Sequence, residues 1–344
     1  MYTQLDFSRF YGPDPTDRDE FCRALVSDLK QYGFVKLVNH DVPAADIDQA
    51  FKTSREFFEL PVDQKLKSPH PPTTHPHRGY SAFGIENVSA VSNHNASKAM
   101  PLLKDMKESY DIGSEHDQLY ANIWPPTGVY DDFQPIFTSF FEVCYRAELA
   151  ILEAISIGLG LPAQTLSQLH ADQSNELRLT HYPAVERGDF THSTRIAAHT
   201  DFGTITLLFQ DSVGGYVSCT NSDRTTLTRL LLILNIPRLE AESPPGSGTF
   251  VDVASGGLHE CIVNVGDCLA KWTGLNSVCH RVHLPDKKSN EVSGQLDIVD
   301  ERFSIAYFGK PDRSASLRPL LGEAKEETYM TAGEFQNMRI QGTY

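Results

Sequence analysis

The stretch "RIAAHTDFGTITLLFQD" (residues 195–211) places a histidine and an aspartate directly before an apolar run typical of a β-strand. His199 and Asp201 stand two residues apart, and alternate residues of a strand project to the same face of a sheet. The two side chains can therefore act as neighbouring ligands of one metal ion. A third ligand must come from a distant strand, and His280 in "SVCHRVHLP" (277–285) is the strongest candidate.

Two imidazoles and one carboxylate on one face of a metal leave up to three positions open, as in the facial triad of non-haem Fe(II) oxygenases. The same donors could serve a zinc hydrolase. Such hydrolases usually add a glutamate base close to a ligand, as in HExxH, and the sequence contains no such motif. A non-catalytic protein of the same fold is a further alternative.

A second pattern occurs in "RFSIAYF" (302–308), where Arg302 and Ser304 face the same way on an apolar strand. An arginine inside a sheet core is costly unless it meets an anion. Its planar guanidinium pairs two N–H groups with a carboxylate, and the hydroxyl of Ser304 adds a third donor. Tyr182 in "LRLTHYP" could add another hydroxyl. The alternatives are an Arg302 paired with an acidic residue of the protein and an ordinary core tyrosine.

The arrangement of helical and strand patterns predicts a mixed, mainly β fold. The first helix is expected over residues 17–31, capped by Thr16 and ended by Gly33. A second helix is expected after a short strand at 34–40 and extends to about residue 59, and a third covers 131–159. From residue 176 the chain consists of short apolar strands separated by turns. We expect a β-sandwich or barrel packed against helices.

The loop "SPHPPTTHPHRGYSAFG" (68–84) contains three histidines, at positions 70, 75 and 77. These could bind a metal ion, but prolines on both sides of His75 favour an irregular, solvated loop. We therefore expect no functional site there.

The composition excludes several classes of partner. The formal charge of −15 argues against nucleic acid and anionic membranes, which require basic surfaces. No apolar stretch approaches the roughly 20 residues of a membrane span, and the N-terminus lacks the pattern of a signal peptide. Six cysteines without a CxxC pair indicate reduced thiols. We expect a cytoplasmic protein; the sequence indicates no oligomeric state.

These motifs make the chain resemble, nearly end to end, the isopenicillin-N-synthase-like family of Fe(II)- and 2-oxoglutarate-dependent dioxygenases. "YGFVKLVNHDVP", "RLTHYP", "HTDFGTITLLFQD", "NVGDCLAKWTGLNSVCHRV", "RFSIAYF" and "TAGEF" resemble successive family segments. The resemblance implies a double-stranded β-helix (jelly-roll) core with N-terminal and flanking α-helices. It implies an N-terminal region over 1–120, and a long helix with the oxygenase core over 121–344.

The resemblance also implies the roles of the site residues. His199, Asp201 and His280 would bind Fe(II), and Arg302 and Ser304, assisted by Tyr182, would hold the distal carboxylate of 2-oxoglutarate. Thr180 is a departure, because many relatives carry an asparagine there that contacts the cosubstrate. With O2, such an enzyme would hydroxylate, desaturate or cyclise a small organic molecule, as in specialised-metabolite biosynthesis. The alternative within the family is an oxidase that uses Fe(II) and O2 without 2-oxoglutarate.

Residues 216–238 depart from the family pattern, because "DSVGG" would otherwise continue directly into "LEAESPPGSGTFVDV". The segment joins a polar half to "LLLIL", which is unusual in a loop between strands. It is either a lineage-specific insertion near the active-site mouth or a retained intron of 69 nucleotides (23 codons), and we favour the second. An insertion here would make an inactive family member more credible.

Overall fold

The computed structural model describes residues 2–73, 77–86, 104–186, 188–189, 193–211, 238–283, 298–322 and 328–340. The segment 216–237 lies outside the described residues, as does His75. The last residue of the unusual segment, Arg238, begins a strand and pairs with His283. The nature of the insertion therefore stays a prediction.

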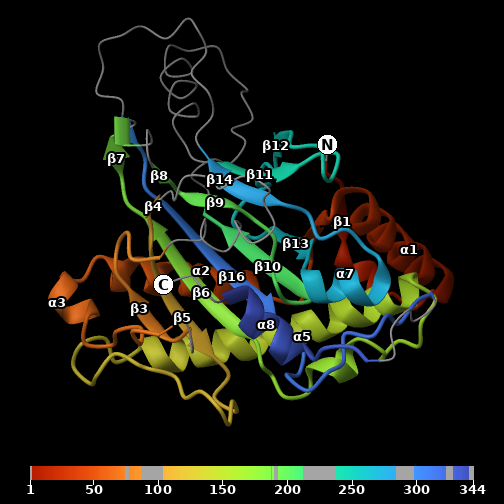
Figure 1. Cartoon of the computed structure of the whole chain (residues 1–344), viewed down its shortest axis with the longest axis horizontal. Helices are drawn as coiled ribbons and strands as arrows, with labels where there is room; N and C mark the ends of the chain where they lie inside the picture. The colour runs from red at the N-terminus through yellow and green to blue at the C-terminus, as the bar shows by residue number, and fades with distance from the viewer. Residues whose placement is uncertain are drawn as a thin grey trace, which may run out of the picture.

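Eight strands form the main sheet (Figure 1). In spatial order they are β1 (Gln4–Asp6), β2 (Phe34–Val38), β13 (Cys261–Val265), β10 (Ile205–Gln210), β16 (Arg302–Gly309), β6 (Glu176–Tyr182), β5 (Glu108–Gly113) and β3 (Gly79–Ser81). The first two strands belong to the N-terminal region, and β2 pairs with β13 of the C-terminal region. One sheet thus spans both regions, and their boundary at residue 120 stays a prediction.

A smaller sheet carries two of the candidate ligands. Its strands, in spatial order, are β12 (Phe250–Asp252), β11 (Arg238–Glu242), β14 (His280–His283) and β9 (Ile196–His199). Two short pairs complete the strands: β7 (Val185–Glu186) with β15 (Ile298–Val299), and β4 (Lys104–Asp105) with β8 (Ser193–Thr194).

The helices are η1 (Phe7–Tyr11), α1 (Pro15–Tyr32), α2 (Ala44–Phe58), α3 (Val62–Lys65), α5 (Phe133–Gly158), η3 (Ser167–His170), α7 (Asp267–Thr273) and α8 (Ala332–Ile340). The three helices predicted with bounds, α1, α2 and α5, begin and end within about two residues of the bounds that were predicted for them, and the other helices were not predicted with bounds. The predicted cap of the first helix is wrong. Asp14, not Thr16, caps α1, because Pro15 suits the first helical position and the Asp14 carboxylate accepts the Thr16 N–H. The stop at Gly33 is confirmed by its left-handed φ of 68°.

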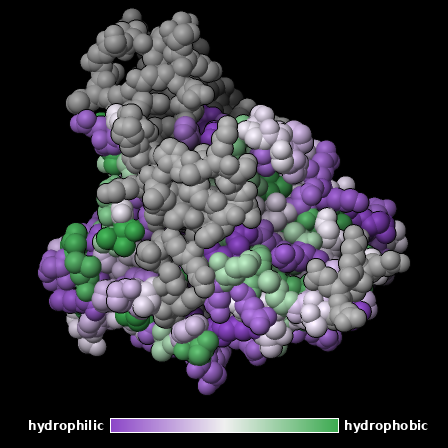
Figure 2. Space-filling view, viewed as in Figure 1, coloured by the Kyte–Doolittle hydropathy of each residue, from purple (hydrophilic) through white to green (hydrophobic). Residues whose placement is uncertain are grey.

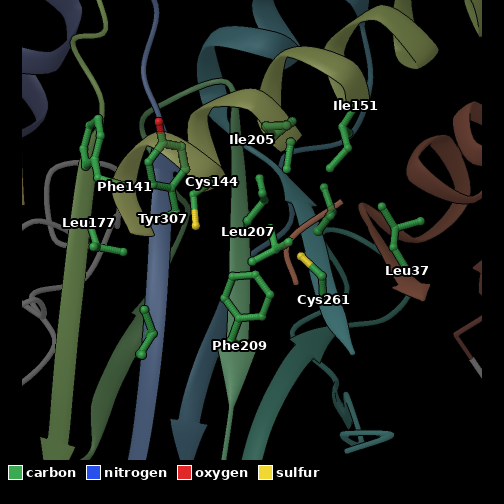
Figure 3. Packing of buried hydrophobic residues seen from close by; sticks show 14 of the residues in the cluster. Leu37, Phe141, Cys144, Ile151, Leu177, Ile205, Leu207, Phe209, Cys261 and Tyr307 are labelled. Carbon is green, nitrogen blue, oxygen red and sulfur yellow. The ribbon is translucent and has the colours of Figure 1, made fainter. Parts of the chain in front are cut away.

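The larger core lies between the main sheet and the helices. Alternation along β10 directs Ile205, Leu207 and Phe209 to this side, toward Cys144 and Ile151 of α5 (Figure 3). The other face of the same strand carries Thr206, Leu208 and Gln210. This alternation is how one strand serves an apolar core on one face and polar chemistry on the other.

A second, smaller core lies between the two sheets. Phe34 and Ile262 of the main sheet pack there with Leu239, Ala241 and Val282 of the small sheet. The molecule is thus layered as helices, main sheet and small sheet (Figure 1). Polar side chains cover the outer surface of α1 in Figure 2. Within the described part of the chain, no helix has both the length and the apolar character that crossing a bilayer requires.

Candidate functional site

Three side chains that are far apart in the sequence meet between the two sheets. Nε2 of His199 lies 3.7 Å from Oδ1 of Asp201, and Nε2 of His280 lies 3.6 Å from the same oxygen. β9 and β14 pair with His199 opposite His280, so their rings lie 4.4 Å apart. One carboxylate oxygen and two imidazole nitrogens thus surround a common point, with donors suited to a divalent metal.

The placement of Asp201 on a strand with His199 is wrong. β9 ends at His199, and Asp201 lies in the turn that leads to β10. The turn is held by α7, whose N–H groups of Asp267 and Cys268 donate to the carbonyls of Asp201 and Gly203. Since these carbonyls bond to a helix start rather than to a neighbouring strand, the chain leaves the sheet here.

Two glycines allow this turn to lie so close to its neighbours. A Cβ atom on Gly203 would stand 2.4 Å from the carbonyl oxygen of Gly309, and one on Gly266 would stand 2.3 Å from that of Gly203. Any larger residue would push the turn, and with it Asp201, away from the histidines. The glycines therefore fix the position of the carboxylate.

Both histidines are oriented by the backbone of their own segment. Nδ1 of His199 lies 2.8 Å from the carbonyl oxygen of Ala197, and Nδ1 of His280 lies 3.2 Å from that of Val278. An N–H at Nδ1 leaves Nε2 as a lone pair aimed at Asp201. Burial, together with the neighbouring His280, lowers the pKa of His199 to about 4. His199 is therefore neutral near pH 7, as a metal ligand must be.

Asp201 is kept ionised by hydrogen bonds from the interior face of the main sheet. Its Oδ2 accepts from Thr206 Oγ1 at 2.6 Å and from Asn264 Nδ2 at 2.7 Å. Burial by itself would raise the pKa of Asp201, but the two histidines and these donors outweigh it and lower the pKa. The other carboxylate oxygen, Oδ1, faces the two histidines and remains available to a metal ion. Thr206 and Asn264 were missed in the sequence, although both lie at interior positions of predicted strands.

Arg302, Ser304 and Tyr182 lie together on the same interior face. Arg302 stands opposite Tyr182 between β16 and β6, with its guanidinium carbon 5.0 Å from the centre of the tyrosine ring. Its Nη2 donates to Gln210 Oε1 at 2.5 Å, whereas Nη1 is buried and has no hydrogen-bond partner among the described residues. No described carboxylate forms an ion pair with Arg302. Thr180 stands opposite Ser304. The buried guanidinium thus has an unused donor suited to an anion.

A cavity adjoins His199 and Asp201. We call it the inner cavity; it is lined by His77, Glu176, Arg178, His199, Thr200, Asp201, Phe202, Gly203, Phe308, Lys310 and Ile340. Part of its lining is apolar, with Phe202, Phe308 and Ile340. Another part, which we call the charged wall, contains Glu176, Arg178 and Lys310.

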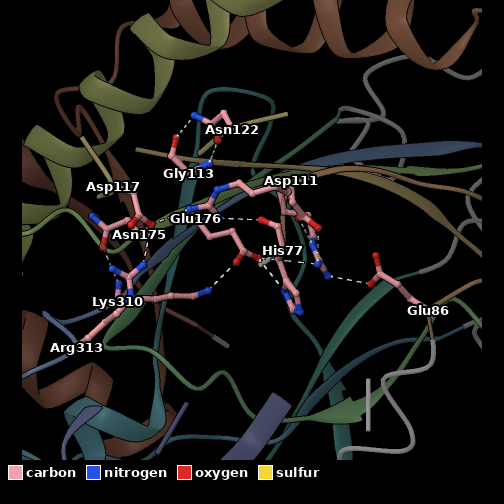
Figure 4. Close-up of polar contacts among 12 residues, drawn as sticks. His77, Glu86, Asp111, Gly113, Asp117, Asn122, Asn175, Glu176, Lys310 and Arg313 are labelled. Atoms are coloured by element: carbon pink, nitrogen blue, oxygen red, sulfur yellow. Dashed lines mark hydrogen bonds and ion pairs between the residues drawn. The ribbon is translucent and has the colours of Figure 1, made fainter. Parts of the chain in front are cut away.

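The charged wall belongs to a buried polar network (Figure 4). Arg178 pairs with both oxygens of Asp111, at 2.6 and 2.9 Å, and Lys310 contacts Glu176 at 2.7 Å. His77 lies 3.5 Å from Glu176. The solvated loop expected around the histidines is therefore wrong for His77, whose side chain is only 10% exposed. The sequence lacked a signal for this network, because its members come from four separate segments.

Comparisons with known proteins agree with this geometry. Residues 4–127 match the family model described as non-haem dioxygenase in morphine synthesis N-terminal. Proline hydroxylase buaE of Petromyces alliaceus is 39% identical over 99% of this chain and 99% of that protein. The 2-oxoglutarate-dependent dioxygenase frbA of a Dothideomycetidae species is 38% identical over 99% and 96%.

Among solved structures, that of a full-length Neurospora crassa protein in complex with alpha-KG and thymine has a TM-score of 0.79 at 29% identity, covering 100% of this chain and 97% of that one. The predicted mainly β jelly roll with flanking helices is confirmed by this match. With relatives of more than 30% identity along almost the whole chain, the predicted family and its cofactors are confirmed as well. The chain belongs to the family of Fe(II)- and 2-oxoglutarate-dependent dioxygenases.

Proposed function

We propose that this dioxygenase oxidises a C–H bond of a small organic molecule bound in the inner cavity, beside Fe(II) held by His199, Asp201 and His280. The observation that carries the proposal is the approach of two Nε2 atoms to one carboxylate oxygen, at 3.7 and 3.6 Å. Two neutral imidazoles and one carboxylate are the donors of the family's iron site, and they leave positions for a cosubstrate and O2.

Arg302, with Ser304 and Tyr182, would hold the distal carboxylate of 2-oxoglutarate. The buried and unpartnered Nη1 of Arg302 supports this role, because an ionised acceptor there would complete its hydrogen bonding. Ser304 is adjacent on the same face of β16 and is 4% exposed. The interior of the sheet would thus bind the cosubstrate through a guanidinium that is shielded from water.

When Fe(II), 2-oxoglutarate and O2 are bound, they supply a strong oxidant through loss of CO2 from 2-oxoglutarate, with succinate as coproduct. The contribution of this chain is to position the substrate and to exclude water. Phe202 and Phe308 form an apolar surface beside the histidines, suited to an apolar carbon of the substrate. The substrate's geometry there would decide between hydroxylation, desaturation and ring formation. We place the reaction in specialised-metabolite biosynthesis; a cytoplasmic location stays a prediction.

The direct test is 2-oxoglutarate turnover by the purified chain. We expect Fe(II)-dependent formation of succinate, stimulated by a metabolite extract that contains the substrate, with products that gain one oxygen or lose two hydrogens. Oxidation of a substrate with O2 consumption but without succinate would instead identify the oxidase alternative. Absence of both activities in the Fe(II)-loaded chain would contradict the proposal.

Replacement of Asn264 by leucine should weaken Fe(II) binding by roughly 10–100-fold, the usual loss when a partner of a metal ligand is removed. The substitution takes one of two donors from Oδ2 of Asp201 while keeping the side chain's approximate size. Equilibrium titration of the protein with Fe(II) under argon measures the effect. Asn276→Leu is the control, because that amide donates to the carbonyl of Lys30, away from the site. Equal Fe(II) affinity in both variants would show that Asn264 does not support Asp201.

A further inference from the structure

A second cavity adjoins the inner cavity. It lies between α8, the segment that precedes β3 and the segment that follows β5. We call it the outer cavity. His77, Glu176, Lys310 and Ile340 line both cavities, so these four side chains stand between the two spaces. A molecule that passes them can extend from the histidine side of the inner cavity into the outer one.

Three residues that line the outer cavity each carry a buried polar atom without a hydrogen-bond partner among the described residues. Arg78, Ser174 and Gln336 line it and are only 4%, 6% and 8% exposed. Nε of Arg78, Oγ of Ser174 and Nε2 of Gln336 have no hydrogen-bond partner among the described residues. Nε of Arg78 and Nε2 of Gln336 can only donate hydrogen bonds, whereas Oγ of Ser174 can both donate and accept. Buried donors left without acceptors are costly, so the cavity favours a ligand rich in acceptor oxygens.

The charges around the cavity add a second, independent observation. Arg78 and Arg313 both pair with Asp117, at 3.1 and 2.6 Å. The whole polar network has five cationic groups against four carboxylates among the described residues: Arg78, Lys107, Arg178, Lys310 and Arg313 against Glu86, Asp111, Asp117 and Glu176. The excess positive charge lies where two guanidinium groups share one carboxylate, beside the outer cavity. Burial lowers the pKa of Arg78 despite its neighbouring carboxylates.

A metal ion is the less suitable occupant of this region. His77, Asp111 and Glu176 offer ligand atoms within 4.8 Å of one another. However, both oxygens of Asp111 accept from Arg178, and Glu176 accepts from Lys310. A cation would have to displace these ion pairs, whereas an anion would add to them.

We propose that the outer cavity binds a carboxylate of the substrate itself, while the carbon to be oxidised lies against Phe202 and Phe308 in the inner cavity. The substrate is then an elongated organic acid whose acidic end lies away from the reacting carbon. This inference rests on the proposed function, because it assigns the inner cavity to the oxidised carbon. In this arrangement, Arg313 and Gln336 recognise the carboxylate of the substrate.

The test uses ω-phenylalkanoic acids of increasing chain length and the primary alcohols of matching length. Their binding is measured by calorimetry, under argon, to the enzyme saturated with Fe(II) and 2-oxoglutarate, so that the cosubstrate occupies its own anion site. At one preferred length we expect the acid to bind about tenfold or more tightly than the alcohol, as a charge-assisted hydrogen bond requires. Arg313→Met and Gln336→Leu should each reduce this preference. Arg318→Met, at an exposed arginine, should retain it.

Equal binding of acids and alcohols at every length would overturn the inference, as would an acid preference that survives both cavity variants. The use of two variants protects the test against misfolding of one of them. Succinate formation by the wild-type enzyme, measured in parallel, separates the two proposals. Succinate without acid preference would refute the outer cavity's role alone, whereas acid preference without any turnover would refute the proposed function.

Discussion

Replacement of Asp201 by alanine should abolish Fe(II)-dependent succinate formation. The expected loss exceeds the roughly 10–100-fold effect of removing an outer partner of a metal ligand. Asp201 is the group to which both imidazoles point, and its charge offsets that of the divalent ion. Without it, only the two histidines remain as ligands, and Thr206 and Asn264 lose the acceptor that they share. Turnover of 2-oxoglutarate and Fe(II) binding are both measured.

Asp252→Ala is the matched control, because Asp252 is an exposed carboxylate that pairs with Arg238 on the small sheet. That variant should bind Fe(II) and form succinate as the wild type does. If Asp201→Ala kept near-normal Fe(II) affinity and turnover, the metal would have to bind elsewhere. Thermal unfolding of both variants without metal shows whether either substitution disturbs the fold itself.

Replacement of Arg302 by methionine should raise the KM for 2-oxoglutarate by roughly 30-fold to several thousand-fold, since truncating one partner of a buried charge pair costs about 2–5 kcal/mol. The variant removes the unpartnered Nη1 that would meet the cosubstrate. Arg302→Lys keeps the charge but loses the planar pair of donors, so its KM for 2-oxoglutarate should lie between those of the wild type and Arg302→Met. Steady-state succinate formation at varied 2-oxoglutarate measures all three proteins.

Arg281→Met is the control for Arg302, because Arg281 is a partly exposed arginine that pairs with Glu240. It should leave the KM for 2-oxoglutarate unchanged. A normal KM in Arg302→Met would assign the cosubstrate's distal carboxylate to another cation. Loss of the anion contact predicts that the KM for 2-oxoglutarate falls from Arg302→Met through Arg302→Lys to the wild type. General damage to the sheet would instead lower kcat without producing this order in KM.

The local elements were predictable because their signals lie within a few residues of one another. In α1, Phe21, Leu25 and Leu29 recur every four residues on the buried side, and Gly33 ends the helix, so its signals lie within its own sequence. The cap was misplaced by two residues because Asp14 and Thr16 are both good capping residues, and Pro15 decides between them. The motif residues were found for the same reason: His199 with Asp201, and Arg302 with Ser304, are each separated by one residue.

The surroundings of the site were not predictable in this way. Asp201 looked like a strand residue because its departure from the sheet depends on α7, which lies more than 60 positions further along the chain. The polar network unites segments around His77, Asp111, Glu176 and Lys310. The pairing of β3, β5, β6 and β16 within the main sheet brings these residues together. In a single sequence such residues are indistinguishable from solvated surface charges.

The most direct test is the crystal structure of the enzyme with Fe(II) and 2-oxoglutarate under argon, with iron located by its anomalous scattering. The account predicts one iron bonded to Nε2 of His199, Nε2 of His280 and a carboxylate oxygen of Asp201, with the far carboxylate of 2-oxoglutarate on the guanidinium of Arg302. Iron bound by other side chains, or a cosubstrate whose far carboxylate does not contact Arg302, would contradict it.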